Sequence, residues 1–500
     1  MNVLFIPIDD LKAIGTLYSE EEGDFLSFVY PDPELRKAVA RRMTPNIQRL
    51  ADSGVAFMHA YCASPACNPS RAAIMTGIRP HRTGLTSNAG AVFFRDFEYE
   101  GERPLADAVT LPELLQAAGW YTASTGKIYH SGADFEKSDG NRSWTDWTSV
   151  SGGAGQKERS RFSPASLPWG QEGDDEATYH KLNDYRTADF IARVLEKGLA
   201  DNGSDRFSIK GEEPFFLACG IFRPHLPFYA TKDLLDLFPV DEMTLSEELL
   251  EYFVEDGRDL PEDALRWIGI TLNDAGDPVI GKERFVDILT QGNRVAGPGG
   301  DLAGWKDMLM HYFASCAIAD RAVGRLLDGL DASPYRDNTM VILWSDHGFH
   351  LGEKIHQTKF TLWDDGSRVN FLIRDPRYPE AAGQRCFRPV SLVDIYPTVT
   401  AMAGLELPDP RISGRDLTPL LMEPAGEWTG YAHTTLRGVF NNMLRVDRWK
   451  LIRYQNNNSS LELYDMVADP EEYHNLTGLE EFAEVRDRML QRLEAALAEE

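Results

Sequence analysis

The chain has 500 residues, of which 43% are hydrophobic and 26% charged, a composition that excludes disordered, collagen-like and coiled-coil proteins. Asp and Glu outnumber Lys and Arg by 78 to 51, giving a net charge of −27, and no long run of Lys and Arg occurs. Nucleic acid and anionic membrane surfaces are therefore unfavourable partners. The five cysteines show no CxxC spacing, which argues against a disulfide scaffold.

No apolar stretch is long enough for a transmembrane helix, so no membrane association is expected. The first residues also lack the basic segment and cleavage site of a secretory leader. This favours a cytoplasmic protein, or a periplasmic one if a leader has been removed.

The chain begins with a short apolar run that ends on two acidic residues. Residues 3–8 are rich in β-branched side chains, which indicates a buried strand, and Asp9 and Asp10 follow directly. Paired aspartates are also common in turns and helix caps. Because ligands of an open α/β sheet gather at the carboxyl ends of its strands, this pair is a candidate binding site.

Strand and helix patterns alternate along most of the chain. Further apolar runs at 121–124, 215–222, 340–344 and 371–373 predict strands. Amphipathic segments predict helices at 44–50, 111–118, 308–330 and 392–403. We read the Met, Phe and Leu residues of 308–330 as core packing. The alternation predicts an α/β fold with a large central, mostly parallel sheet flanked by helices.

Two stretches interrupt this alternation. Residues 131–176 and 255–304 lack a hydrophobic period and are rich in polar residues and Gly, so we expect long surface excursions. Such segments either shape a substrate site or are partly disordered.

A proline-rich linker at 405–410 divides the chain into a large domain, 1–410, and a small C-terminal subdomain, 411–500. Within the subdomain, hairpin strands are predicted over 443–454 and 461–464, and a helix from about residue 480. We therefore expect an α+β subdomain with an antiparallel sheet.

The most informative segment is Cys67-Asn68-Pro69-Ser70-Arg71, followed by Thr76-Gly77. Pro69 can open a helix, which would place Cys67 near a helix N-terminus, where backbone N–H groups favour anions. Arg71 adds a bidentate cation for an oxyanion. For an isolated cysteine, a buried structural role would be the usual reading.

This segment resembles the signature of type I sulfatases of the alkaline phosphatase superfamily, and other segments extend the resemblance across most of the chain. The similarity is greatest to iduronate-2-sulfatase-like enzymes. In this family the cysteine is oxidised to formylglycine, the catalytic aldehyde. The resemblance therefore implies that a formylglycine-generating enzyme matures Cys67, and that residues 1–410 form an alkaline-phosphatase-like catalytic domain.

A metal site is expected at the strand ends, since Asp346 and His347 directly follow the predicted strand 340–344 and its last polar residue, Ser345. Carboxylates with an oxygen at residue 67 suit Ca²⁺ or Mg²⁺ better than Zn²⁺. His347 replaces the Asn of many sulfatases, as it does in iduronate-2-sulfatase-like enzymes. The resemblance implies Ca²⁺, with Mg²⁺ as the alternative, bound by Asp9, Asp10, Cys67, Asp346 and His347.

Four further residues are candidates for sulfate binding. Lys127 and His130 follow the predicted strand 121–124, and His225 lies between two prolines just past the strand 215–222. Taken alone, these residues and Lys359 would be ordinary solvated side chains. The resemblance implies that four residues interact with the sulfate and its leaving oxygen, namely Lys127, His130, His225 and Lys359.

Other candidates stay open or are structural. His350 and His356 either line the mouth of the site or are solvated. We interpret the remaining cysteines as buried thiols, namely Cys62, Cys219, Cys316 and Cys386.

The function expected from this resemblance is hydrolysis of a sulfate monoester on a carbohydrate, such as an iduronate-2-sulfate-like or algal polysaccharide-derived sugar. Hydrated formylglycine would attack sulfur, His225 would protonate the leaving oxygen and His130 would act as a base. The alternatives are a phosphonate monoester or phosphodiester hydrolase of the same superfamily, and a non-catalytic carbohydrate-binding relative. The sequence does not fix the oligomeric state.

Overall fold

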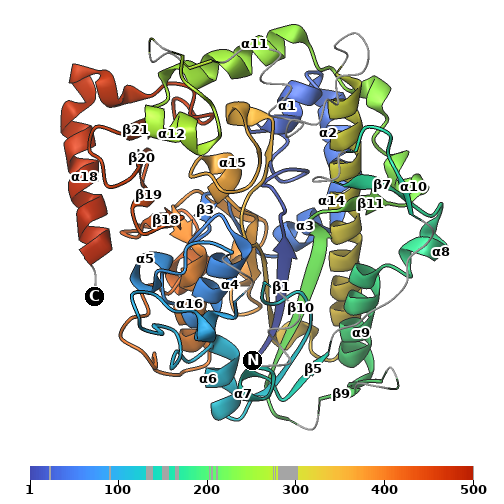
Figure 1. Cartoon of the computed structure of the whole chain (residues 1–500). Coiled ribbons are helices and arrows are strands. Elements are labelled where there is room, and N and C mark those ends of the chain that lie inside the picture. The colour runs from blue at the N-terminus through green and yellow to red at the C-terminus, as the bar shows by residue number, and fades with distance from the viewer. Residues whose placement is uncertain are drawn as a thin grey trace.

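An eight-stranded sheet forms the centre of the computed structural model (Figure 1). The structure describes residues 1–500 except 22–23, 89–91, 131–138, 149–156, 164–167, 202, 204–205, 210–211, 274, 276–277, 280–301 and 499–500. The strand order is β16-β2-β15-β12-β1-β10-β4-β5. The strands are β1 (Asn2–Asp9), β2 (Val55–Phe57), β4 (Tyr121–Gly126), β5 (Asp146–Thr148), β10 (Phe215–Pro224), β12 (Thr339–Ser345), β15 (Phe371–Arg374) and β16 (Gln384–Cys386).

Five neighbouring strands of the sheet are parallel to one another, namely β12, β1, β10, β4 and β5. Strand β15 runs antiparallel to both β12 and β2. All eight residues of β1 are buried. A strand covered on both faces has no polar side to present to water, which explains its continuous apolar sequence. The predicted α/β class with a mostly parallel central sheet is confirmed.

Successive side chains of β1 enter two different cores. Leu4, Ile6 and Ile8 pack with helices on one face, and Val3 and Phe5 with helices on the other. The first face carries α2 (Pro33–Met43), α3 (Pro45–Asp52), α9 (Asn183–Lys197) and α14 (Ala303–Asp331). The second carries α4 (Cys67–Thr76), α6 (Leu111–Ala117) and α16 (Ile395–Met402). The predicted helix 308–330 lies within α14 and forms core, as expected.

A second, antiparallel sheet lies near the C-terminus (Figure 1). It consists of β18 (Ala432–Leu436), β19 (Asn441–Val446), β20 (Trp449–Arg453) and β21 (Leu461–Asp465), and α18 (Ala483–Ala498) covers one face through a small apolar core. The expected antiparallel sheet and final helix are confirmed. The domain boundary at 410 stays a prediction.

The two expected surface excursions are more structured than their composition suggested. Within 131–176, β5 joins the main sheet and β7 (Trp169–Glu172) pairs with β6 (Lys157–Arg159) and β11 (Phe228–Ala230). Within 255–304, α12 (Glu262–Trp267) follows α11 (Glu247–Asp256) and buries Leu265. The prediction was wrong for these parts, because strands of three or four residues are too short to show a period. The other parts, 131–138, 149–156, 164–167 and most of 274–301, lie outside the described residues.

The remaining α-helices and strands are short. None of the described helices has both the length and the apolarity needed to span a bilayer. They are α1 (Phe25–Val29), α5 (Pro80–Thr83), α7 (Gly140–Ser143), α8 (Glu176–Tyr179), α10 (Lys232–Leu235), α15 (Asp364–Ser367), α17 (Thr418–Met422), β3 (Ala60–Tyr61), β8 (Leu199–Asp201), β9 (Arg206–Ser208), β13 (His350–Leu351), β14 (Gln357–Thr358) and β17 (Val390–Ser391).

Candidate active site

Acidic residues converge where two neighbouring parallel strands end. Asp9 closes β1 and Asp346 follows β12, and the register pairs Ile8 with Ser345. The backbone N–H of Asp10 donates to Asp346 Oδ1 at 3.1 Å. Asp10 has φ +59°, a left-handed conformation that Asp tolerates better than most residues. The carboxylates therefore meet because the two strand ends are adjacent.

Cys67 is the first residue of α4 and is fully buried. Its Sγ lies 3.3 Å from His347 Nε2 and 3.0 Å from Lys359 Nζ. Pro69 lies in the first turn, where the missing backbone donor is not needed. The side chain of residue 67 thus faces the strand ends from a helix N-terminus, as the motif predicted.

Four of the predicted metal ligands form one compact group. Single donor atoms of Asp9, Asp10, Cys67 and His347 all lie within 4.8 Å of one another, and all four residues are buried. Asp346 Oδ1 lies beside them, 3.6 Å from His347 Nε2. Buried carboxylate oxygens that converge in this way fit a hard divalent cation.

Arg71 holds the two strand ends together. Its guanidinium is fully buried, with Nε 2.8 Å from Asp346 Oδ2 and Nη2 3.1 Å from Asp9 Oδ1. Nη1 donates to the backbone carbonyls of Lys127 and Ile128 at 2.7 and 3.0 Å. These hydrogen bonds fix the carboxylates and the end of β4 in one arrangement.

The lysines and histidines surround the same group. Lys127 pairs with Asp9, and Lys359 Nζ lies 2.8 Å from Asp10 Oδ1. His225 Nε2 lies 3.9 Å from a carboxylate oxygen of each aspartate, and His225 and His130 both lie near enough to Cys67 to interact with its charged form. The structure therefore brings together all the site residues that the sequence suggested.

The charges of the cluster favour a negative group at residue 67. Burial alone would raise the pKa of the Cys67 thiol, but Lys359, Lys127 and His347 outweigh it and lower the pKa well below its usual range. Burial likewise opposes the charged form of Lys359, yet Asp10 and Cys67 raise its pKa. A site of this kind can hold an anionic nucleophile beside a tetrahedral oxyanion.

The segment that carries Lys359 is strained. Thr358 and Phe360 have φ values of +81° and +75°, which side-chain-bearing residues rarely adopt. Two hydrogen bonds hold this conformation, from Trp267 Nε1 to Phe360 O at 2.6 Å and from Phe360 N to Pro65 O at 3.2 Å. The role of Trp267 was not predicted, because no local sequence pattern links α12 to Lys359.

His350 and His356 belong to the loop before Lys359. His350 is fully buried, with Nδ1 3.0 Å from Glu353 O and Nε2 2.5 Å from Thr361 Oγ1. His356 Nε2 lies 3.0 Å from the carbonyl of Lys359. Hydrogen bonds to the backbone therefore give both rings a structural role in this loop.

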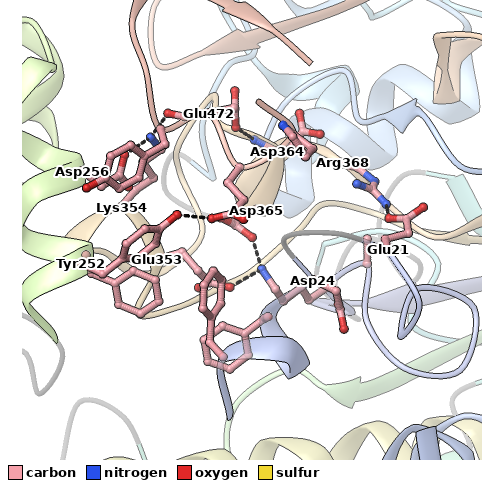
Figure 2. A pocket seen from close by; sticks show the side chains of 18 of the residues that line it. Glu21, Asp24, Tyr252, Asp256, Glu353, Lys354, Asp364, Asp365, Arg368 and Glu472 are labelled. Atoms are coloured by element: carbon pink, nitrogen blue, oxygen red, sulfur yellow. Dashed lines mark hydrogen bonds and ion pairs between the residues drawn. The ribbon is translucent and has the colours of Figure 1, made fainter. Parts of the chain in front are cut away.

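A cavity of about 270 Å³ lies beside the same loop (Figure 2). Glu353, Asp365, Lys354 and Asp256 are among its lining residues, and Lys12 pairs with both Glu353 and Asp365. Although His350, Glu353 and Asp365 lie close together, the Lys12 ammonium already pairs with both acids and both His350 nitrogens are hydrogen-bonded. This cavity is lined by none of the residues that surround Cys67.

The other cysteines are structural, as predicted. Cys62, Cys219, Cys316 and Cys386 are buried and free. Burial raises the pKa of each thiol, in contrast to Cys67.

Comparisons with known proteins identify the family of the chain. The family model "Sulfatase" matches residues 6–405, and "N-sulphoglucosamine sulphohydrolase, C-terminal" matches residues 352–499. A sulfatase of Formosa agariphila is 28% identical over 485 residues, covering 95% of this chain and 82% of that protein. Mouse iduronate 2-sulfatase is 27% identical over 448 residues, covering 82% of this chain and 69% of that protein.

Solved structures share the fold. BT4656 in complex with its substrate D-glucosamine-2-N,6-O-disulfate has a TM-score of 0.66 at 24% identity, covering 100% of this chain and 97% of that chain. A phosphonate monoester hydrolase from Silicibacter pomeroyi has a TM-score of 0.68 at 18% identity, covering 98% and 94%. Because the sulfatase family model spans most of the chain, including Cys67 and its surrounding cluster, the chain belongs to the sulfatase family of sulfuric ester hydrolases.

Proposed function

We propose that this enzyme hydrolyses a sulfate monoester carried by a carbohydrate, with formylglycine formed from Cys67 as the nucleophile. The observation that carries the proposal is the position of residue 67 at the N-terminus of α4, in contact with Lys359 and His347. A site that lowers the pKa of a thiol at this position would equally stabilise an anionic oxygen there.

The chain's own residues divide the work around that nucleophile. Hydrated formylglycine supplies the oxygen that attacks sulfur. Lys127 and Lys359 neutralise the sulfuryl oxygens. His225, at the open side of the cluster with its side chain 25% exposed, donates a proton to the leaving oxygen. His130 then accepts the proton of the second hydroxyl at residue 67, so that sulfate is expelled and the aldehyde is restored.

Asp9, Asp10, Asp346 and His347, together with residue 67, would hold Ca²⁺ or Mg²⁺. Such an ion would lower the pKa of the nucleophilic oxygen and polarise the sulfate. Arg71 keeps Asp9 and Asp346 in place for that purpose.

The names of several relatives support a carbohydrate substrate. The matches include an N-acetylglucosamine-6-O-sulfatase of Bacteroides thetaiotaomicron, an iduronate 2-sulfatase and an ulvan-active sulfatase of Formosa agariphila. All three names denote enzymes of sulfated sugars.

The test combines mass spectrometry of the peptide spanning residue 67 with turnover of p-nitrophenyl sulfate. Protein made with a formylglycine-generating enzyme should carry the aldehyde and be active, whereas Cys67→Ala should lose activity by about 10³-fold or more. Full activity with an unmodified thiol would overturn the formylglycine proposal.

Parallel assays separate the alternatives. A phosphonate monoester or phosphodiester hydrolase would turn over aryl phosphonate or phosphodiester esters faster than aryl sulfate. A binding protein would retain sulfated oligosaccharides without releasing sulfate.

A further inference from the structure

An exposed arginine, Arg437, lies over two aromatic rings beside the catalytic cluster, the group of charged residues around Cys67. It follows β18, and its guanidinium carbon lies 5.1 Å from the ring centre of Trp267 and 5.0 Å from that of Phe360. Both rings are partly exposed. Stacking of this kind holds a planar guanidinium in place while its N–H edge stays free to bind an anion.

The chain places this arginine close to residue 67. Phe360 directly follows Lys359, so the Cα atoms of these two residues lie about 3.8 Å apart. The Nζ atom of Lys359 in turn contacts Cys67. On the other side, Thr435 N donates to Ala63 O at 2.9 Å and Arg437 N to Thr86 O at 3.2 Å. Arg437 therefore follows a strand that is bonded to the segment leading into Cys67, and its side chain lies over the segment that carries Lys359.

The charge of Arg437 is not neutralised within the part of the chain that the structure describes, where no carboxylate forms an ion pair with it. Its counterpart Arg448, at the other end of β19, also lies over a ring, 5.4 Å from that of Trp449, but is paired with Asp465. In a chain with a net charge of −27, a cation without a carboxylate partner beside an anion-binding site points to an anionic ligand.

We propose that Arg437 binds a second anionic group of the sugar substrate, a carboxylate or a second sulfate, while Trp267 and Phe360 hold its guanidinium in position. The inference rests on the proposed function and narrows it to sulfated sugars with at least two anionic groups. Arg437 is then a specificity-determining residue, because it contacts the substrate away from the reacting sulfur.

The experiment compares kcat/KM on matched pairs of substrates. In the first pair, N-acetylglucosamine-6-O-sulfate carries one anionic group and glucosamine-2-N,6-O-disulfate carries two sulfates. In the second pair, a 2-O-sulfated hexuronide is compared with the corresponding 2-O-sulfated hexoside, which lacks the carboxylate. The variants are Arg437→Gln and Arg437→Lys, with Arg448→Gln as the control. Thermal unfolding checks that each variant is folded.

In the substrate pair that the wild-type enzyme turns over faster, Arg437→Gln should lower kcat/KM about ten- to hundredfold on the doubly anionic member. The loss should arise mainly through KM. The singly anionic member and p-nitrophenyl sulfate should change less than about threefold. Arg437→Lys should recover part of the loss, since it keeps the charge but not the planar fork. The pair on which Arg437→Gln loses kcat/KM shows whether the second anionic group is a carboxylate or a sulfate.

An equal loss on singly and doubly anionic substrates would overturn the inference, because Arg437 would then only support Phe360 and Lys359. An unchanged preference in Arg437→Gln would overturn it as well. These outcomes can be distinguished from a failure of the proposed function. In that case the wild-type enzyme would release sulfate from none of these esters.

Discussion

Cys67 lies among charges that would be unfavourable in isolation. Asp9, Asp346 and Arg71 are fully buried, and buried ions are tolerated only when paired and hydrogen-bonded. Here the pairs are made between different elements, so the charges hold β1, β12 and α4 in register around residue 67. The same contacts that stabilise the ions thus position the nucleophile.

Replacing His225 tests the leaving-group step. If His225 protonates the leaving oxygen, His225→Ala should lower kcat about 10²- to 10⁴-fold on a sugar sulfate, whose alkoxide is a poor leaving group. The loss on p-nitrophenyl sulfate should be much smaller, because nitrophenolate leaves without a proton. Steady-state kinetics on both substrates measure the difference.

His180→Ala, which removes a histidine that is 45% exposed in its side chain, is the control and should change neither rate. Equal losses of His225→Ala on the two substrates would assign His225 to binding instead.

Single residues of the site differ in how far they could be predicted. Asp9, Asp10 and Asp346 follow apolar runs, so strand ends alone suggested them. Lys359 has no such local signal, and only the family resemblance indicated it. Arg437 and Trp267 were not predicted at all, because their contact joins segments 170 residues apart in sequence and depends on how α12 packs.

At the scale of elements, two parallel strands approach closely just before Lys127. Gly220 of β10 pairs with Gly126 of β4, and Gly126 has φ +76°. A Cβ on Gly220 would lie 2.1 Å from the carbonyl oxygen of Lys127, so no larger residue fits without moving the backbone. This close approach fixes the direction in which Lys127 leaves the sheet.

Gly220→Ala should therefore affect both stability and catalysis. Displacement of the Lys127 backbone should lower the free energy of unfolding by about 1–3 kcal/mol. It should also reduce kcat on p-nitrophenyl sulfate, since Lys127 and the carbonyl that binds Arg71 move together. Urea unfolding and steady-state kinetics measure the two effects.

The control is Gly478→Ala, because a Cβ there meets no atom within 4 Å. A Gly220→Ala enzyme with wild-type kcat would show that Lys127 does not depend on this contact.

Elements with a clear period were predicted well, and short ones were not. The runs that became β1, β10 and β12 are long and continuously apolar, so burial on both faces was evident from the sequence. By contrast, β5 has only three residues, Asp146–Thr148, and its place in the sheet comes from pairing with β4. Tertiary pairing of this kind leaves no pattern in the strand itself.

Over the whole molecule, the acidic residues are not confined to the surface. Besides the catalytic cluster, several buried carboxyl groups away from it have raised pKa values, because burial disfavours their charged form. The pKa is raised to about 8 for Asp24, about 7 for Asp256 and Asp320, and about 6 for Asp394. Each such group holds its proton more tightly in the folded than in the unfolded chain.

The sign of the resulting pH dependence follows directly. A carboxyl group with a raised folded pKa contributes most stability below its unfolded pKa of about 4, and this contribution falls as the pH rises toward the folded pKa. For Asp24 the window runs from about pH 4 to about pH 8. Its Oδ2 is buried and has no hydrogen-bond partner among the described residues, so no contact with them is lost at that oxygen on substitution.

Asp24→Asn removes this titration and should make the protein relatively more stable as the pH rises. The difference in free energy of unfolding between Asp24→Asn and wild type should be more favourable to the variant at pH 8 than at pH 5. The change is on the order of 2 kcal/mol, or a few degrees in Tm. Comparing the two pH values within one variant cancels the change in packing. Asp241→Asn removes a charge from an exposed site and should shift both melting temperatures equally. If Asp24→Asn behaves like Asp241→Asn in calorimetry at the two pH values, Asp24 is already ionised in the folded protein.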